Sequence, residues 1–322
     1  MVNQDANFTK HFDNYGVMSI MPHSLYLYQT RIEERSTFAN KISGKLFDDV
    51  IFREIQFKDE ANDIIEVVET HTEYNLRSKS EIRNLLFSSG NISNIYIDAS
   101  GLNVRSISHL LKCALELSSE KAVKVFIVYA EPAAYKVGKF SEEGEYLDLS
   151  ERIKGIYPIP GFEVIKPSAG RIMFVPLLGF EGGRFAYVLS QVESPDVITF
   201  PIVGVSGYRL EYPFVTFYGN RRPLIETDSW GAVKYAMAGS IVDAFYTLLI
   251  LHEKHEGVFM KIAPLGTKPH AMAALLFACC YPRDTEIIYD NPVRVKKRTS
   301  GVGKVSITCV SDLIVGLDRK IL

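Results

Sequence analysis

The segment that decides the fold runs from Phe259 to Pro292 and reads FMKIAPLGTKPHAMAALLFACCYPRDTEIIYDNP. Met260–Ala263 is an apolar run too short for a helix, and the prolines and glycine of Pro264–Pro269 end it. Ala271–Cys280 is rich in Ala and Leu, which predicts a helix. Glu286–Tyr289 predicts a second strand. The order strand, loop, helix, strand is typical of an α/β unit.

The loop between this strand and this helix has the features of an anion site. A glycine between a strand and a helix directs backbone N–H groups and the positive helix end toward one point, and Lys268 adds a full charge there. We expect Gly266, Thr267 and Lys268 to bind one oxyanion. His270 offers a further ligand contact or an acid. The alternatives are a tight turn at Gly266 that binds nothing and a polar surface position at His270.

The chain contains this unit twice. Asn94–Pro132 has the same order, with strands at Ile95–Asp98 and Val123–Tyr129 on either side of a polar loop and a helix. Both units end in Tyr-x-x-Pro, at Tyr129–Pro132 and at Tyr289–Pro292. Such self-similarity indicates an internal duplication.

The repeat extends toward the N-terminus of each unit. Ser24–Thr30 and Arg171–Leu178 predict strands, and each leads into a helix start that carries Glu and Arg. A further strand and a further helix follow in each half. The first half has them at Val50–Phe57 and Lys79–Ser88, and the second at Asp196–Val203 and Gly239–Lys254.

We therefore predict an α/β protein of two tandem Rossmann-like, three-layer halves related by internal duplication. The length of 322 residues fits two domains. Polar residues without a period predict an N-terminal arm, and Tyr157–Gly161 gives the connector between the halves a turn-rich stretch. The predicted divisions are an arm at 1–20, half 1 at 21–135, a connector at 136–170, and half 2 at 171–322 with an aromatic insertion at 206–235.

Composition indicates an ordinary globular protein. Hydrophobic residues make up 47% and charged residues 23%, and the net charge of −2 gives no direct evidence for binding to nucleic acid or a membrane. The longest apolar run, Tyr235–Leu251, contains Asp243 and is shorter than the ~20 residues of a membrane span. The four cysteines form no CxxC pair and no secretory signal is evident, so we expect a reduced, cytoplasmic protein.

Several functional classes lack their motifs in this sequence. Gly-x-Gly-x-x-Gly, GxxxxGK[ST] and Gly-x-Ser-x-Gly are all absent, which disfavours dinucleotide oxidoreductases, P-loop NTPases and α/β-hydrolases. His252 and His255 have a spacing that could hold a metal, but the sequence places no third ligand, and a solvated last helical turn is the favoured interpretation. We expect neither a cofactor nor a metal.

Candidate site residues follow equivalent strands in the two halves. The carboxyl ends of parallel strands are where open α/β folds bind ligands, so these residues could meet at one pseudo-two-fold cleft. After the first, third and fourth strands, respectively, they are Glu34, Arg35, Glu181 and Arg184; Asp98, Ser100, Arg105, Gly266, Thr267 and Lys268; and Tyr129, Glu131, Tyr135, Tyr289, Asp290 and Arg298.

Two glycine-containing turns add detail to this set. Gly182 and Gly183 let the backbone come close to another group, so we expect Arg184 to reach the Lys268 loop. The basic residues from Arg294 to Arg298 lead into Ser300-Gly-x-Gly, which either forms a backbone anion nest or is a solvated edge.

One family resemblance rests on Pro264-Leu-Gly-Thr-Lys268 and the Ala/Met-rich helix after it. This segment resembles the Gly-Gly-Thr-Lys loop and following helix of CRISPR-associated Rossmann fold (CARF) sensor domains, which dimerise and bind cyclic oligonucleotides. The resemblance implies ligand binding by Gly266, Thr267 and Lys268. Leu265 replaces the first glycine of that family, the first half has Ala99–Gly101 instead, and no recognisable nuclease or winged-helix domain follows.

Two functions remain open from the sequence. The first is a sensor, generally similar to bacterial antiviral-defence proteins, that binds a nucleotide or other phosphorylated signal and reports to a protein effector partner. The second is an enzyme on the same scaffold that cleaves or transfers a nucleotide, with Asp98, Glu131 or Glu181 as the acid or base. A structural subunit of a defence complex is a third possibility.

Overall fold

A computed structural model gives the structure of the chain and describes residues 5–31, 33–37, 42, 47, 49–87, 90–135, 149–157, 159–164, 171–192, 196–295 and 298–321, with side chains to residue 316. The chain forms two compact units. Unit 1 consists of Met1–Tyr135 and Thr299–Leu322, and unit 2 of Lys136–Arg298. Parts of the predicted helix after Ser24–Thr30, most of the connector, and Lys296 and Lys297 lie outside the described residues.

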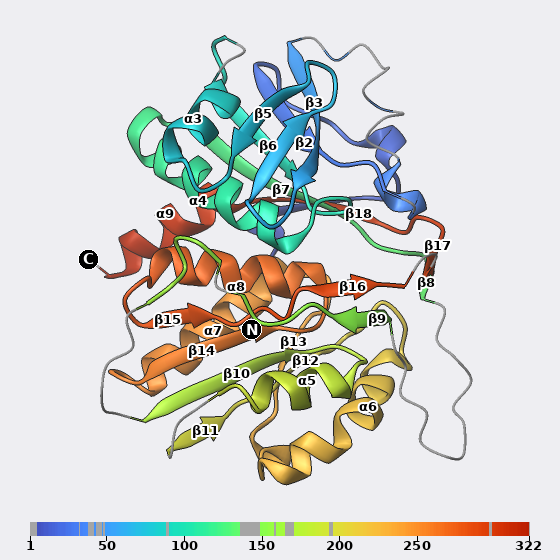
Figure 1. Ribbon diagram of the computed structural model, residues 1–322, viewed down its shortest axis with the longest axis vertical. Coiled ribbons are helices and arrows are strands. Elements are labelled where there is room, and N and C mark those ends of the chain that lie inside the picture. Colours follow the sequence, from blue (N-terminus) through green and yellow to red (C-terminus); the bar gives the residue numbers. More distant parts are fainter. Residues whose placement is uncertain are drawn as a thin grey trace. The chain divides into compact units, whose positions relative to one another are not determined.

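Unit 1 is built on an eight-stranded sheet of order β1-β18-β7-β6-β2-β3-β4-β5 (Figure 1). β3, β2, β6 and β7 are parallel neighbours, whereas β18 pairs antiparallel with β7 and β4 antiparallel with β3. Its strands are β1 (Thr9–Phe12), β2 (Ser24–Tyr28), β3 (Val50–Asp59), β4 (Ile64–Val67), β5 (Thr72–Asn75), β6 (Asn94–Asp98), β7 (Lys124–Ala130), β8 (Ala134–Tyr135), β17 (Thr299–Ser300) and β18 (Val305–Cys309). Its helices are α1 (Asp5–Phe8), η1 (Tyr15–Val17), η2 (Glu34–Ser36), α3 (Lys79–Phe87), α4 (Val104–Lys121) and α9 (Val310–Ile321).

Alternating side chains of the parallel strands form an aromatic layer on one face of this sheet. The ring centroids of Tyr26 and Tyr96 lie 6.0 Å apart, and those of Tyr96 and Phe126 lie 4.6 Å apart. Tyr15 and Met18 belong to the same buried cluster. Because successive residues of a strand point to opposite faces, this layer is defined by every second residue of β2, β6 and β7.

Two predicted boundaries are wrong in unit 1. The described part of the predicted arm, residues 5–20, is folded into unit 1, because β1 pairs with β18 in the sheet and Tyr15 is 1% exposed. The second half does not extend to residue 322, because β18 pairs with β7 from Val305↔Ala130 to Cys309↔Phe126. The C-terminal strand β18 is therefore part of the first sheet, and α9 is part of unit 1.

Unit 2 has a parallel sheet of order β13-β12-β10-β14-β15, with β11 paired to the first part of β10. In chain order this is 3-2-1-4-5, the order of the doubly wound Rossmann fold. Its strands are β10 (Ile172–Leu178), β11 (Val197–Thr199), β12 (Ile202–Gly204), β13 (Lys234–Ala236), β14 (Phe259–Pro264) and β15 (Thr285–Ile287), and a separate ribbon pairs β9 (Ser150–Ile153) with β16 (Pro292–Arg294).

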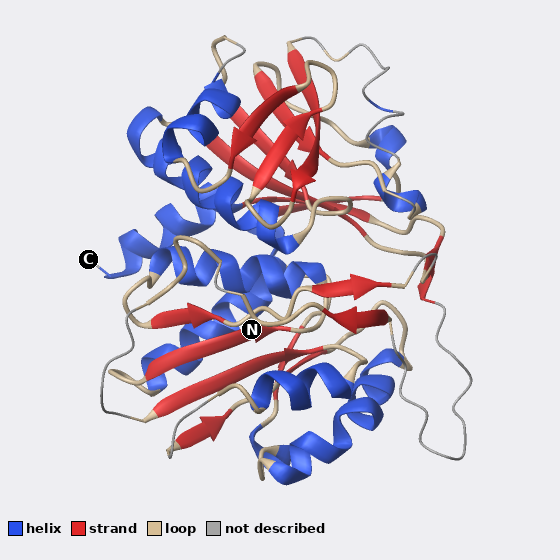
Figure 2. Ribbon diagram, in the orientation of Figure 1, coloured by secondary structure: helices blue, strands red, loops and turns tan. Residues whose placement is uncertain are grey.

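Helices cover both faces of the unit 2 sheet (Figure 2). α5 (Gly182–Leu189) packs against α6 (Tyr212–Glu226), and α7 (Ile241–Lys254) packs against α8 (Lys268–Cys280); η3 (Trp230–Ala232) precedes β13. Every residue of β10 and of β14 is buried, as expected for parallel strands that helices cover on both faces. The predicted α/β class is therefore observed, with a three-layer arrangement in unit 2.

The segment predicted as an aromatic insertion at 206–235 is instead a regular part of the fold. It supplies α6, which packs on α5 and β12, and it leads into β13. Its helical character was hidden because Pro213 and Pro223 both disfavour helix by simple propensity. Pro213 stands in the first turn, where a missing N–H is tolerated, whereas Pro223 lies inside the helix.

The four predicted strands have the same spatial order in the two sheets. The order is β3-β2-β6-β7 in unit 1 and β12-β10-β14-β15 in unit 2, which is 2-1-3-4 in both. The predicted central strands, β6 and β14, correspond in this order. Unit 1 differs from unit 2 after its first strand, where a short 3₁₀ helix, η2, occupies part of the segment predicted to be an α-helix. Descent of the units from one duplicated sequence stays a prediction.

Candidate functional site

The direction of strand progression in unit 2 reverses between β10 and β14. From β10 the chain moves outward through β12 to β13, and then returns to the other side of β10 to form β14. In open α/β sheets, ligands bind outside the carboxyl ends of the strands at this reversal. The loops that reach this point are Gly179–Glu181, after β10, and Leu265–Thr267, after β14.

These two loops are in direct backbone contact. A Cβ atom on Gly266 would lie 2.5 Å from the carbonyl oxygen of Leu178, and one on Gly179 would lie 2.8 Å from that of Leu265. The N–H of Leu265 also donates to the carbonyl of Leu177, at 3.0 Å. Gly266, predicted as a ligand position, thus has a packing role that no larger residue could fill without moving a loop.

Gly182 and Gly183, at the start of α5, have different surroundings. A Cβ on Gly182 would lie 1.9 Å from the carbonyl oxygen of Gly219 in α6, so this glycine permits close contact between two helices. A Cβ on Gly183 would have no atom within 4 Å, and Gly183 is exposed. Neither packing nor a positive φ explains glycine at position 183.

Arg184 joins the loops after three strands. Its Nε and Nη2 donate to the two carboxylate oxygens of Asp290 at 2.7 Å each, and its Nη1 donates to the carbonyl of Leu265 at 2.7 Å and to Glu181 at 3.3 Å. Arg184 is 3% exposed. Burial disfavours its charge, but the hydrogen bonds and charge of Asp290 raise the pKa of the guanidinium above its ordinary value.

The predicted contact between Arg184 and the Lys268 loop is therefore present, through Leu265. Arg184 does not line an open cleft, because its guanidinium is buried and binds groups of the protein itself. Glu181 also accepts from Arg294 Nη1, at 3.0 Å, which adds β16 to the same group. Arg184, Glu181 and Asp290 thus position the loops of the reversal point.

At the start of α8, Thr267 and His270 bind a neighbouring loop. The Thr267 hydroxyl donates to the carbonyl of Ala238 at 2.7 Å, and His270 Nε2 lies 3.1 Å from the carbonyl of Met237. Thr267 is also the N-cap residue, accepting from the N–H of His270. The expectation that the Thr267 hydroxyl donates to a ligand is therefore wrong for this structure, since that proton is used on Ala238.

Lys268 occupies the first turn of α8 and is half-buried. That turn contains no acidic residue. A cation at a helix N-terminus is unfavourable in itself, because the N-terminal N–H groups carry partial positive charge. An anion bound at this point would interact favourably with the positive end of the helix.

His270 gives this region a predicted pH dependence. It is 0% exposed, and burial lowers its pKa to about 4, although the Met237 carbonyl and Asp243 act in the opposite direction. Because the unfolded histidine titrates near 6.5, the unfolded chain binds the proton first as the pH falls. The contribution of neutral His270 to folding stability is therefore complete above pH 6.5 and is lost as the pH falls toward 4.

We expect this histidine to remove about 2 kcal/mol of stability between pH 7 and pH 5. Urea denaturation of the wild type and of His270→Gln at both values measures it. Gln keeps an N–H donor for Met237 but does not titrate, so the variant should lose about 2 kcal/mol less than the wild type over this interval. Equal losses in the two proteins would contradict the assignment.

In unit 1 the corresponding carboxyl edge is filled by the protein's own side chains. Asp98 accepts from the Tyr26 hydroxyl at 2.8 Å and from the N–H of Ser100 at 2.8 Å. The Tyr15 hydroxyl lies 3.1 Å from Ser100 Oγ, which accepts from the N–H of Ala130 at 2.9 Å. All four of these side chains are less than 5% exposed. Burial and the Asp98 charge raise the pKa of both phenols well above the ordinary value, so both remain donors.

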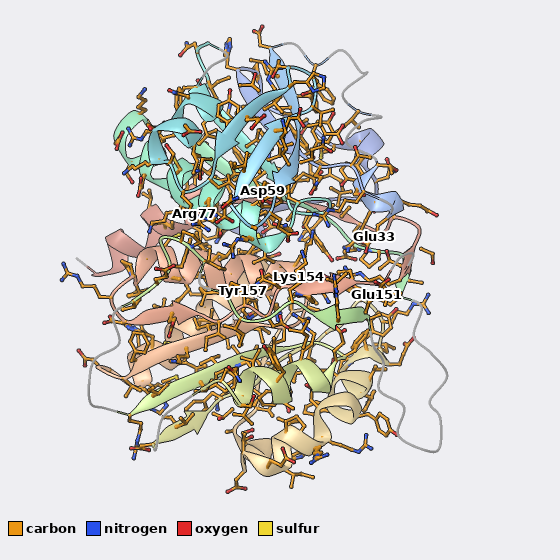
Figure 3. All side chains as sticks on the ribbon, viewed as in Figure 1. Glu33, Asp59, Arg77, Glu151, Lys154 and Tyr157 are labelled. Atoms are coloured by element: carbon orange, nitrogen blue, oxygen red, sulfur yellow. The ribbon has the colours of Figure 1, made fainter. Side chains whose placement is uncertain are left out.

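Arg35 adds a second anchor to this edge. Its Nε and Nη2 bind Glu33, each at 2.7 Å, and its Nη1 donates to the Tyr129 hydroxyl at 3.0 Å (Figure 3 labels Glu33). Burial disfavours its charge, but Tyr129, Tyr135 and Glu33 raise the pKa of the guanidinium above its ordinary value. In unit 1, Arg35 thus connects the loop after β2 to the end of β7. In unit 2, Arg184 connects the segment after β10 to Asp290, after β15, in the same way.

Several predicted residues have other partners. Arg105 binds the buried carboxylate of Asp63, which also accepts from Arg77 at 2.8 Å (Figure 3 labels Arg77). Glu131 is half-buried, and burial raises its pKa. Tyr289 is buried beside Arg184 and Arg298 is half-buried, while Ser300 is exposed in β17.

The turn after Ser300 binds a carboxylate of the protein itself. The N–H of Gly301 donates to Glu34 Oε2 at 3.0 Å, and Gly301 has a φ of 65°. The predicted anion nest thus accepts an internal anion at this position. A cleft shared by the two units stays a prediction.

Sequence reasoning missed several members of these groups. Tyr26 could have been found, because it shares a face of β2 with Tyr28, and its partner on the neighbouring strand, Tyr96, shares a face of β6 with Asp98. Tyr15 gave no local signal, and Arg294 was noted only as one of the basic residues before Ser300. Asn220, which donates to the carbonyl of Gly179 at 2.7 Å, was missed with α6.

The described residues contain no group of three His, Cys, Asp or Glu side chains able to hold a metal. His252 instead lies 3.5 Å from Asp284 and packs on the Tyr281 ring. Within the same described ranges, none of the helices combines the length and the apolar character needed to span a bilayer.

Comparisons with known proteins assign no family to the chain. No family model matches it, and no curated protein matches it. A solved structure described as CobK precorrin-6A reductase aligns over 86% of this chain and 91% of its own, with 10% identity and a TM-score of 0.24. A likeness this low carries no argument about fold or function.

Proposed function

We propose that unit 2 binds a nucleotide or another phosphorylated small molecule at the reversal point between β10 and β14. The observation that carries the proposal is the 3-2-1-4-5 strand order, which brings the Gly179–Gly183 and Leu265–Lys268 segments together at the carboxyl edge. The exposed backbone at Gly183 and the ammonium of Lys268 offer an anion two kinds of contact at neighbouring helix starts.

Binding is favoured over catalysis by the state of two of the three candidate carboxylates. Asp98 and Glu181 are 2% and 5% exposed, and both accept hydrogen bonds from protein donors. Such carboxylates are suited to holding loops in place. The resemblance of the Lys268 loop to CARF sensors supports a signalling nucleotide as the ligand, and a protein effector of a bacterial defence system as the recipient of the signal.

Gly183→Ala tests the proposal because it should raise the stability of the protein and lower its affinity for the ligand. Gly183 is in the first turn of α5 with space for a methyl group, so alanine should stabilise the protein by about 0.5–1 kcal/mol. If a ligand approaches the backbone there, the added Cβ should weaken its binding at least tenfold. Thermal unfolding and calorimetric titration with AMP, ADP, cyclic di-AMP and inorganic phosphate measure the two effects.

Ala186→Gly is the matched control. Ala186 is exposed in the same helix, so glycine there should destabilise the protein while leaving affinity unchanged. Two results count against the proposed site: the wild type binds none of these probes, or Gly183→Ala binds its probe as tightly as the wild type does.

A further inference from the structure

The outer face of α6 carries apolar residues toward solvent. Phe214 is 74% exposed and Ile225 is 70% exposed, and their spacing of about three helical turns puts them on one face. Val215 and Leu224, on the inner face, are 1% and 0% exposed. A surface helix ordinarily shows polar residues to solvent, so this face of α6 (yellow in Figure 1) has the composition of a contact surface.

The apolar area continues beyond the helix. Leu210, just before α6, is 87% exposed, and Trp230 and Tyr235, after it, are 50% and 57% exposed. The Phe217 ring connects Trp230 and Tyr235 to the helix, because its centroid lies 5.6 Å from that of Trp230 and 6.5 Å from that of Tyr235. We name Leu210, Phe214, Ile225, Trp230 and Tyr235 the α6 surface.

The size of the α6 surface matches a protein interface. With ~150–250 Å² for each large side chain, the exposed fractions amount to an area on the order of 600 Å². One partner of a standard interface contributes ~800 Å², and exposed apolar patches of several hundred Å² commonly mark binding sites.

We propose that the occupant is a second copy of this chain, with the two α6 helices antiparallel about a two-fold axis. The outer face of α6 can pack against the same face of an antiparallel copy. A two-fold axis that passes the helix between residues 219 and 220 places Phe214 of one copy against Ile225 of the other. The same axis places Arg221 against Tyr218, and within the chain the Arg221 guanidinium already lies 4.3 Å from the centroid of that ring. In this arrangement each Arg221 faces the aromatic ring of Tyr218 on the other copy rather than another cation.

Symmetry supports this occupant as well. A two-fold contact uses the same surface on both copies and closes the assembly at two chains.

Sedimentation equilibrium of the full chain tests the proposal. The wild type should sediment as a dimer, and Phe214→Ser combined with Ile225→Ser should raise the dimer dissociation constant at least thirtyfold. Both positions are exposed in the single chain, so the variant should retain the wild-type circular dichroism spectrum. Ile250→Ser, a change at a 49% exposed position on α7, is the control and should leave the dimer intact.

Cysteine cross-linking tests the antiparallel arrangement. The double variant Phe214→Cys, Ile225→Cys should form a disulfide-linked dimer on mild oxidation, and neither single variant should. The two positions are ~16 Å apart along one helix, too far for a bridge within a chain. A wild type that sediments as one chain at every concentration, a dimer that persists in the double serine variant, or cross-linking by a single variant would overturn the proposal.

Discussion

Arg184→Met is expected to cost 3–5 kcal/mol of folding stability, the largest effect of any single change considered. Asp290 is 0% exposed, and Arg184 supplies hydrogen bonds to both of its carboxylate oxygens. Removing the guanidinium leaves that carboxylate charged, buried and without this partner, which costs far more than the pair contributes to stability. The carbonyl of Leu265 also loses its donor. Urea denaturation at pH 7 measures the change.

Two further variants separate the buried charge from simple loss of volume. Arg184→Met combined with Asp290→Asn should be less damaging than Arg184→Met alone, because the second change removes the stranded charge. Arg171→Met is the control in the same unit: Arg171 binds Asp196 at 3.0 Å, but both side chains are more than half exposed, so little stability should be lost. A loss at Arg184 as small as the loss at Arg171 would contradict the positioning role.

The parallel strands could be predicted because burial on both faces makes them continuous apolar runs. Ile172–Leu178 and Phe259–Pro264 are strands of this kind, and the glycine loops after them mark where each helix begins. From these strands the carboxyl-edge position of Arg184 and of the Lys268 loop also followed, since parallel strands end at one edge.

Other features depend on contacts that no local pattern encodes. Thr9 pairs with Thr308, across nearly the whole chain, so the place of the N- and C-terminal segments in one sheet could not be read from either segment. Arg184 and Asp290 were each predicted as ligand positions, but nothing local showed that they would bind each other. Two prolines concealed α6, and with it the helix face that we propose as an interface.

Lys268→Ala is expected to weaken binding of a phosphorylated ligand by roughly ten- to a hundredfold. A charge-assisted contact contributes about 1.5–3 kcal/mol, which corresponds to that range of affinity. Stability should change little, because the contacts of a partly exposed lysine contribute little to folding. Lys254→Ala is the matched control: Lys254 is exposed in the last turn of α7, so its removal should affect neither affinity nor melting temperature.

The most direct measurement is calorimetric titration of the wild type, Lys268→Ala and Lys254→Ala with AMP, ADP, cyclic di-AMP and inorganic phosphate. Our account predicts saturable binding of at least one probe by the wild type and by Lys254→Ala, and a ten- to hundredfold loss in Lys268→Ala at an unchanged melting temperature. Equal affinity of all three proteins, or no binding of any probe by the wild type, would contradict a phosphate site at the reversal point of the unit 2 sheet.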